Sequence, residues 1–172
     1  MTRVARLPAR RWREARMLRL EALKTDPAAF GSSYEEEVDR PEDEWVSRMK
    51  NTLFALSGEK PVGMISRVFN DRIKTAHVAA IYGFYVTPKS RGRGIGKLLF
   101  ARALQDIQGN RKIIKVQLSV NPKFRAALGI YRSFGFEAAG TAKNELRVGS
   151  RYYDMLNMEK EVRRYKIGEK DL

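Results

Sequence analysis

The chain of 172 residues contains no cysteine, which excludes disulfide bonds, zinc sites built from thiolates and cysteine nucleophiles. Its one histidine, His77, leaves no cluster of histidine ligands, and we predict no metal site. A Ser-His-Asp triad would have to use His77, which lies in a strand-like run with nothing nearby to complete the triad. We therefore expect a structural or solvent-facing role for this residue.

Long apolar runs are absent as well. No stretch reaches the length that crosses a membrane, and no apolar segment follows the basic residues of Met1–Trp12, as a secretory signal would require. We therefore expect a cytoplasmic protein with no membrane partner. A single domain of this length buries roughly 70% of the surface that its unfolded chain exposes, so it can fold without a metal or a disulfide.

Acidic residues are scarce relative to basic ones. The chain has 20 Asp and Glu against 34 Lys and Arg, which gives a formal net charge of +14. A charge of this sign suits an anionic small molecule, and it equally suits nucleic acid. Composition alone does not choose between these two kinds of ligand.

The sequence is organised around the segment Ile81–Leu104, which predicts a strand, a glycine-rich turn and a helix. Ile81–Val86 is aromatic and β-branched, as is typical of a strand, and Thr87 and Pro88 end it. The turn reads RGRGIG, and an amphipathic run follows it. Such a turn leaves backbone N–H groups unpaired at the positive end of a helix dipole, where they can bind phosphate. Three basic side chains add charge to this predicted anion site: Arg91, Arg93 and Lys97.

Two better-known phosphate loops do not fit this turn. A P-loop requires glycine where Arg91 stands, and it requires Ser or Thr where Leu98 follows the lysine. The dinucleotide fingerprint G-x-G-x-x-G would begin at Gly92 and Gly94, but its third glycine is replaced by Lys97. The pattern that fits is Arg-x-x-Gly-x-Gly between a strand and a helix.

Periodicity and turn residues divide the rest of the chain into helices and strands, without repeats or internal linkers. We expect helices over 12–23, from about 41, from 95 and over 125–134, and strands over 2–8, 53–57, 62–69, 74–86, 113–120, 136–142 and 151–158. This order predicts an α/β fold with three layers and a mixed, largely antiparallel sheet. We expect one domain over residues 1–160 and a charged C-terminal tail over 161–172.

The motif formed by Arg91, Gly94 and Gly96, after a strand that ends in Tyr85-Val86, resembles the signature of the GNAT family of acetyl-CoA-dependent N-acetyltransferases. The predicted order of elements from Val4 to Glu159 is also similar to that of the family. The resemblance implies a GNAT-like α/β/α fold. It also implies an N-acetyltransferase that moves the acetyl group of acetyl-CoA to a primary amine.

The resemblance further implies where coenzyme A binds. In the family, the loop amides hold the pyrophosphate, and the main chain of the preceding strand pairs with the pantetheine arm. Acetyl-CoA is therefore the expected acetyl donor, with no metal. The residues expected to bind it are Phe84, Tyr85, Val86, Arg91, Gly92, Arg93, Gly94, Ile95, Gly96, Lys97, Asn121 and Tyr131.

Acetyl transfer requires a deprotonated amine, a donor for the developing oxyanion and an acid for the departing thiolate. The resemblance places the oxyanion donor at the backbone N–H near Val86. It places the acid at Tyr131, because a tyrosine three residues before Phe134-Gly135-Phe136 matches the family pattern. Read without the resemblance, this tyrosine is more typical of a core aromatic on an amphipathic helix. Since the chain has no cysteine to carry the acetyl group, we expect direct attack in a ternary complex.

One position departs from the family pattern. Members often carry an asparagine seven residues before the tyrosine, where this chain has Phe124. Asn121, at the end of the preceding strand, is a candidate replacement. An ordinary Asn-Pro turn is the alternative interpretation.

No residue is singled out as the general base. Some family members carry a glutamate where this chain has Tyr82. The alternatives that remain for the base are Glu35, Glu36 or Glu37, a water chain, or an amine that arrives partly neutral. The acidic stretch Glu35–Glu44 falls in the segment that, by the resemblance, borders the acceptor pocket, where it could attract a cationic amine. We therefore predict substrate contacts for Glu35, Glu36 and Tyr82. A solvated helix face is the alternative.

Other functions remain open. The chain could be a basic nucleic-acid-binding module in which RGRGIG and the N-terminal arginines contact phosphates, although the acetyltransferase interpretation requires no nucleic acid. It could also be a GNAT member that binds acyl-CoA without catalysis. The sequence leaves the acceptor unidentified, whether a small molecule, a protein N-terminus or a lysine. It also leaves the oligomeric state open, a homodimer included.

Overall fold

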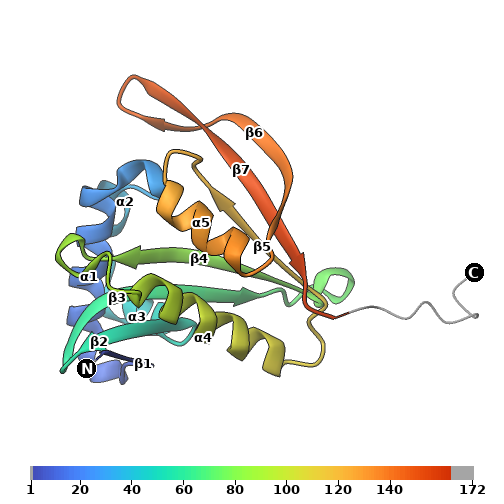
Figure 1. Ribbon diagram of the computed structural model, residues 1–172. Helices are drawn as coiled ribbons and strands as arrows, with labels where there is room; N and C mark the ends of the chain where they lie inside the picture. Colours follow the sequence, from blue (N-terminus) through green and yellow to red (C-terminus); the bar gives the residue numbers. More distant parts are fainter. Residues whose placement is uncertain (1, 164–172) are drawn as a thin grey trace, which may run out of the picture.

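The computed structural model describes residues 2–163, which form one mixed sheet of seven strands with helices on both faces (Figure 1). The strands are β1 (Thr2–Ala5), β2 (Thr52–Ser57), β3 (Lys60–Phe69), β4 (Val78–Val86), β5 (Lys115–Val120), β6 (Glu137–Val148) and β7 (Arg151–Glu161). The α-helices are α1 (Trp12–Thr25), α2 (Tyr34–Glu37), α3 (Glu42–Met49), α4 (Ile95–Gly109) and α5 (Arg125–Ser133). Short 3-10 helices are η1 (Ala9–Arg11), η2 (Pro27–Ala29), η3 (Ile73–Thr75) and η4 (Pro88–Ser90). This is the three-layer α/β fold that the sequence predicted.

The strands lie in the order β1-β2-β3-β4-β5-β7-β6. Strands β4 and β5 are parallel, because α4 carries the chain back between them, and the other neighbours are antiparallel. The hairpin of β6 and β7 extends well beyond the rest of the sheet (Figure 1). Within residues 2–163, no helix combines the length and the apolar character that crossing a membrane requires.

Two apolar cores hold the helices against the sheet, one on each face. Strand β2 divides its side chains between them, since successive residues of a strand point to opposite faces. Leu53 and Ala55 pack into the core that contains α4 and α5, whereas Phe54 and Leu56 pack into the core that contains α1 and α3. The two cores therefore fix the helical layers independently on either side of one sheet.

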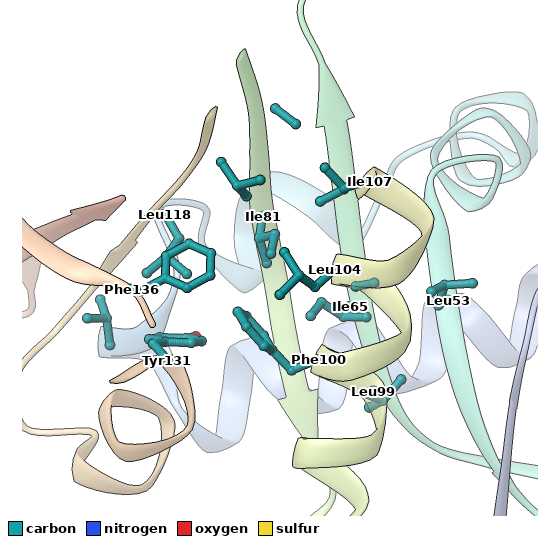
Figure 2. Close-up of a cluster of buried hydrophobic side chains, with 14 of the residues drawn as sticks. Leu53, Ile65, Ile81, Leu99, Phe100, Leu104, Ile107, Leu118, Tyr131 and Phe136 are labelled. Carbon is teal, nitrogen blue, oxygen red and sulfur yellow. The ribbon is translucent and has the colours of Figure 1, made fainter. Parts of the chain in front are cut away.

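Aromatic side chains join α4, α5 and the sheet on one of these faces (Figure 2). Phe100 of α4 is fully buried, and its ring centre lies 5.1 Å from that of Tyr131 and 5.5 Å from that of Phe136. The ring of Phe84, on β4, lies 6.0 Å from both Phe100 and Tyr131. This tilted packing stabilises the contact of α5 with α4 and sets the position of Tyr131.

A β-bulge in β4 changes which side chains face each core. Gly83 has φ +60°, a left-handed conformation that glycine adopts without strain, and the pairing with β3 shifts register at this point. Ile81, before the bulge, packs with α4. After it Phe84 packs with α4, and Tyr85 packs with α1. The extra residue has therefore reversed the alternation of the strand.

The structure differs from the predicted elements mainly at their ends. The acidic stretch contains the extra single-turn helix α2, whose start is closed by a capping box between Ser33 and Glu36. Strand β4 begins at Val78 rather than at residue 74, because the residues before it form η3. Strand β6 continues to Val148 instead of ending at 142, and β7 ends at Glu161. Residues 164–172 of the predicted tail lie outside the described part of the chain.

Candidate active site

Strands β4 and β5 lie side by side only where each begins. Val78–Ala80 pair with Lys115–Gln117, and beyond them the two strands diverge (Figure 1). The opening is part of a cavity of about 1320 Å³ that reaches from the loop before α4 to residues of α1 and α3. Where the two strands diverge, main-chain N–H and C=O groups at their edges have no neighbouring strand. Such groups require another hydrogen-bond partner, which a ligand can supply.

The main chain at the end of β4 is directed into this opening. Thr87 donates its N–H to the carbonyl of Val62, on β3, at 2.9 Å. Because successive residues of a strand direct their N–H groups to opposite sides, the N–H of Val86 points away from β3. On that side no strand of the described chain pairs with Val86, which also lines the cavity. The residue predicted to supply an oxyanion donor therefore lies where a ligand can reach it.

The loop before α4 turns on two glycines in the left-handed region. Gly92 has φ +74° and Gly94 has φ +77°, and other residues adopt these angles only with strain. Gly94 is the N-terminal cap of α4, and no side chain bonds to the first amides of the helix. Throughout residues 2–163, no hydrogen bond uses the N–H of any residue from Gly92 to Lys97. These amides and the positive end of the helix dipole can hold an anion.

Gly96 serves a different purpose from the two glycines before it. A Cβ atom at this position would lie 3.1 Å from Cδ1 of Ile130 and 3.2 Å from Cζ of Phe84. Such contacts are tighter than ordinary packing, so glycine here lets the start of α4 approach β4 and α5 closely. The third glycine of the motif therefore sets a helix contact rather than a turn.

Arg91 belongs to the scaffold of the loop. Its Nε donates to the Val86 carbonyl at 2.9 Å, and its Nη2 donates to the Asp26 carboxylate at 2.5 Å. The guanidinium group therefore joins the end of β4 to the segment that follows α1, with its charge balanced by Asp26. Of the other predicted cations, Lys97 lines the cavity and Arg93 does not.

Two basic residues near this loop were missed by the sequence analysis. Lys123 and Arg125 stand at the start of α5, and both line the cavity. The sequence does contain a signal for them. Like the glycine loop between β4 and α4, they are basic residues in a turn between a strand and a helix, directly after Asn121-Pro122. They add positive charge that the divided sheet places at the same opening as α4.

Tyr131 belongs both to the aromatic core and to the wall of the cavity. It is a core aromatic that is 6% exposed, and it also lines the cavity. Burial raises the pKa of its hydroxyl, since the ionised form would lose hydration. The hydroxyl therefore stays protonated at neutral pH and can donate a hydrogen bond.

The side chain of Tyr85 packs toward α1, although the residue is among those that line the cavity. Its hydroxyl donates to Glu21 of α1 at 2.9 Å, and burial raises its pKa to about 12. Its main chain pairs with Met64 of β3. The bulge at Gly83 is the cause, because it turns the side chains of Phe84 and Val86 toward α4 instead. The contact of Tyr85 with coenzyme A stays a prediction.

Asn121 ties together two sides of the opening. It is 2% exposed, its Nδ2 donates to the carbonyl of Ala28 at 3.2 Å, and its Oδ1 accepts from the Lys123 N–H at 3.0 Å. Within the protein, the Asn121 side chain therefore stabilises the turn at Asn121-Pro122 and its contact with the segment at Ala28. Phe124, at the position where family members often carry asparagine, lines the cavity beside it.

The structure does not bring Glu35 and Glu36 into the cavity. Both are exposed on α2, and the carboxylate of Glu36 accepts from the Ser33 N–H in the capping box. Glu37 is fully buried between Arg19 and Arg48, so it is not available as a free base. Burial alone would raise the pKa of Glu37, but the two guanidinium groups outweigh it and lower the pKa to about 2.

The acidic residues of the described cavity lining are Asp26, which is bound by Arg91, and Glu145. Glu145 lies in an irregular part of β6, where the register with β7 shifts between Ala142 and Leu146. No sequence signal places it in the cavity, because its position depends on that shift. Tyr82, which the sequence analysis proposed as a substrate contact, lines the cavity and is 56% exposed.

A family model for the acetyltransferase (GNAT) family matches residues 16–136. A relative described as an uncharacterised N-acetyltransferase, from Methanocaldococcus jannaschii, is 34% identical over 94 residues, which are 54% of this chain. The match spans 41% of the length of that relative.

Solved structures reproduce the fold over nearly the whole chain. YncA of Salmonella typhimurium, determined with its cofactor acetyl-CoA, superposes with a TM-score of 0.83 at 13% identity, covering 98% of both chains. A ribosomal-protein-alanine N-acetyltransferase from Brucella melitensis superposes with a TM-score of 0.77 at 21% identity, covering 93% of this chain and 99% of the other. At such identities the likeness shows the fold alone.

Proposed function

The chain belongs to the acetyltransferase (GNAT) family, and from this premise we propose that it transfers the acetyl group of acetyl-CoA directly to a primary amine. The observation that carries the proposal is the run of unbonded amides from Gly92 to Lys97, beside a divided sheet. Amides at a helix N-terminus suit a pyrophosphate, and an open strand edge suits the amide-containing arm of coenzyme A. The residues present therefore fit this donor.

The proposed reaction forms one bond and breaks another. Acetyl-CoA supplies an activated acetyl group, the acceptor nitrogen bonds to its carbonyl carbon, and the carbon–sulfur bond breaks. The N–H of Val86 is positioned to stabilise the negative charge that develops on the carbonyl oxygen. The hydroxyl of Tyr131, kept protonated by burial, donates to the leaving thiolate. The amine gives up its proton to solvent, either before or during the attack.

The composition of the chain supports direct transfer. It has no cysteine on which an acetyl group could be held as a thioester, and we propose that donor and acceptor are bound together. A protein acceptor and a small-molecule acceptor are both compatible with the family. The ribosomal-protein-alanine acetyltransferase shares only the fold with this chain, so its acceptor does not decide the question.

The test measures donor binding and turnover separately. Calorimetry with acetyl-CoA should show saturable binding, and release of the coenzyme thiol in the presence of an amine panel should show transfer. Since the protein has no thiol of its own, a thiol reagent reads the released coenzyme without background. Binding without turnover on any amine would indicate a non-catalytic acyl-CoA-binding protein. Salt-dependent binding to DNA or RNA, with none to acetyl-CoA, would overturn the proposal.

A further inference from the structure

Beside the bulge of β4 the cavity is lined by side chains that no step of the transfer uses. Arg19 of α1 and Arg48 of α3 reach the cavity from the helical layer beneath the sheet. The Nη1 atom of Arg19 lies 3.8 Å from the position that a Cβ atom of Gly83 would occupy. We call this region the acceptor end, comprising Arg19, Arg48, Asn51, Thr52, Ser66 and Tyr82, which all line the cavity.

The acceptor end carries a surplus of positive charge. Arg19 Nε and Nη2 donate to the two carboxylate oxygens of Glu37 at 3.0 and 2.9 Å. Arg48 Nη2 donates to Oε1 of the same carboxylate at 3.1 Å, and its Nη1 lies 3.1 Å from Oε2 as an ion-pair contact. One carboxylate is thus shared by two guanidinium groups, so one positive charge is left unbalanced at the edge of the cavity. Arg19 Nη1 takes no part in any hydrogen bond of the described residues.

Neutral hydrogen-bonding groups surround this charge. The hydroxyls of Thr52 and Ser66 lie 2.8 Å apart, and the Ser66 hydroxyl is 3.5 Å from the position of a Gly83 Cβ atom. Asp26, one of the two acidic residues in the described lining, is bound to Arg91. A site of this kind repels a second cation and favours a carboxylate, which a guanidinium group binds through paired hydrogen bonds.

We propose that the acceptor of the transfer is a small amine that itself carries a carboxylate, of the amino-acid class. The inference rests on the proposed acetyl transfer and names the substrate class of the same cavity. Arg48 and the free Nη1 of Arg19 bind the carboxylate through N–H donors. The amine is thereby held near the end of β4, where its nitrogen attacks the acetyl carbon and the coenzyme leaves as a thiol.

The carboxylate inference differs from the sequence-based expectation for this pocket. The acidic run at Glu35–Glu44 suggested attraction of a cationic amine, with a solvated helix face as the alternative. The fold turns Glu37 inward as a counter-ion and leaves Glu35 and Glu36 outside the cavity. What faces the acceptor is the arginine pair that Glu37 orients.

The first test compares matched substrates on the unaltered protein. Each L-amino acid of a panel is assayed beside its carboxamide, with saturating acetyl-CoA and detection of the released thiol. We expect the best acids to exceed their carboxamides in kcat/KM by roughly 10- to 100-fold, the usual effect of a hydrogen bond to a charged group. The neighbouring carboxylate raises the pKa of the amine, so the carboxamide has the more available nitrogen, and this bias opposes the expected result.

The second test removes the charge at Arg48. In the Arg48→Gln variant we expect KM for amino acids to rise roughly 10- to 100-fold, with KM for carboxamides and the affinity for acetyl-CoA unchanged. Glu37 keeps its two bonds from Arg19, so the fold should persist. The matched control is Arg40→Gln, which removes an equal charge from a residue that pairs with Glu44 outside the cavity. That control should leave all three constants unchanged.

The outcomes separate this inference from the function on which it rests. Equal turnover of acids and carboxamides, or Arg48→Gln and Arg40→Gln behaving alike, would overturn the carboxylate assignment and leave the acetyltransferase proposal standing. Faster acetylation of peptides with a free N-terminus than of single amino acids would also overturn the carboxylate assignment and would indicate a protein acceptor. Absence of acetyl-CoA binding would remove both proposals at once.

Discussion

At the loop before α4 the cavity presents main-chain amides from one continuous segment, whereas at the acceptor end it presents side chains from separate helices and strands. Gly92–Lys97, which we call the donor end, contributes N–H groups that form no hydrogen bond with any atom of residues 2–163. The acceptor end depends on Arg19 and Arg48, which are held by a single buried carboxylate. The amides of the donor end suit any anion of the right shape. The arginines of the acceptor end suit one group in particular, the carboxylate of the proposed substrate.

The two ends should therefore respond differently to substitution. Main-chain amides cannot be removed by changing a side chain, so the donor end is damaged only by altering glycine conformation or by adding charge. The acceptor end is damaged by deleting single side chains, because its binding groups are those side chains. Four variants test this contrast, taken from the largest expected effect to the smallest.

The Gly94→Asp substitution should have the largest effect. A carboxylate beside the bound pyrophosphate, at about 4 Å, costs about 4 kcal/mol at the effective dielectric of a protein surface, which is about a thousandfold in acetyl-CoA affinity. A Cβ atom at this position meets no atom within 4 Å, so the loss would come from charge and backbone strain rather than from a clash at Cβ. Calorimetric titration measures it.

Gly149→Asp is the matched control for this substitution. Gly149 also has a left-handed φ and open space around it, but it lies in the turn between β6 and β7, outside the cavity lining. Its substitution should leave acetyl-CoA affinity unchanged. Equal losses in the two variants would show that backbone strain, and not the anion site, is responsible.

The Glu37→Gln substitution should show how much the acceptor end depends on one carboxylate. The pKa of Glu37 is lowered from 4.5 to about 2, which corresponds to about 3 kcal/mol of stability. Because the folded-state pKa is the lower one, this stability is present above about pH 4.5 and is lost as the pH falls toward 2. Urea unfolding at several pH values should therefore show a smaller acid dependence in the variant. Glu35→Gln, on the exposed side of the same helix, should keep the wild-type profile within about 0.5 kcal/mol.

The Tyr131→Phe substitution tests the proposed role of the Tyr131 hydroxyl as the acid for the leaving thiolate. Loss of the hydroxyl should lower kcat roughly 100-fold and leave KM for acetyl-CoA unchanged, because the aromatic packing remains. Burial raises the pKa of this tyrosine, so kcat of the unaltered protein should show no loss from its ionisation up to about pH 10. Steady-state kinetics across pH measures both effects. Unaltered turnover in the variant would remove Tyr131 from the mechanism.

The Asn121→Ala substitution should have the smallest effect. It leaves the Ala28 carbonyl and the Lys123 N–H without their partner, at a cost of about 1–2 kcal/mol in unfolding free energy. Asn110→Ala is the control, since Asn110 also accepts from an N–H two residues on but is exposed. Urea unfolding of the two variants compares them. Identical free energies of unfolding would show that the hydrogen bonds of Asn121 to Ala28 and Lys123 do not stabilise the protein.

Much of the donor end could be predicted from the sequence, because its information is local. The order of strand, turn and helix and the positions of Gly92 and Gly94 follow from neighbouring residues, and the structure places all of them as expected. Arg91 was assigned to the anion, but the structure pairs it with Asp26, a residue far away in the chain. Lys123 and Arg125 follow a readable strand-ending turn, but their place at the cavity depends on the divergence of β4 and β5, which the sequence does not show.

The fold class and the glycine loop were predictable from the sequence, since they depend on periodicity and on φ angles that short stretches of chain dictate. The family was predictable because the motif of Arg91, Gly94 and Gly96 resembles the GNAT signature. The composition of the acceptor end, by contrast, depends on tertiary contacts. The bulge at Gly83 chose which side chains of β4 face the opening, and the packing of α2 against α1 turned Glu37 into a buried partner for two arginines. Both outcomes depend on contacts between residues far apart in the chain, and no local pattern records such contacts.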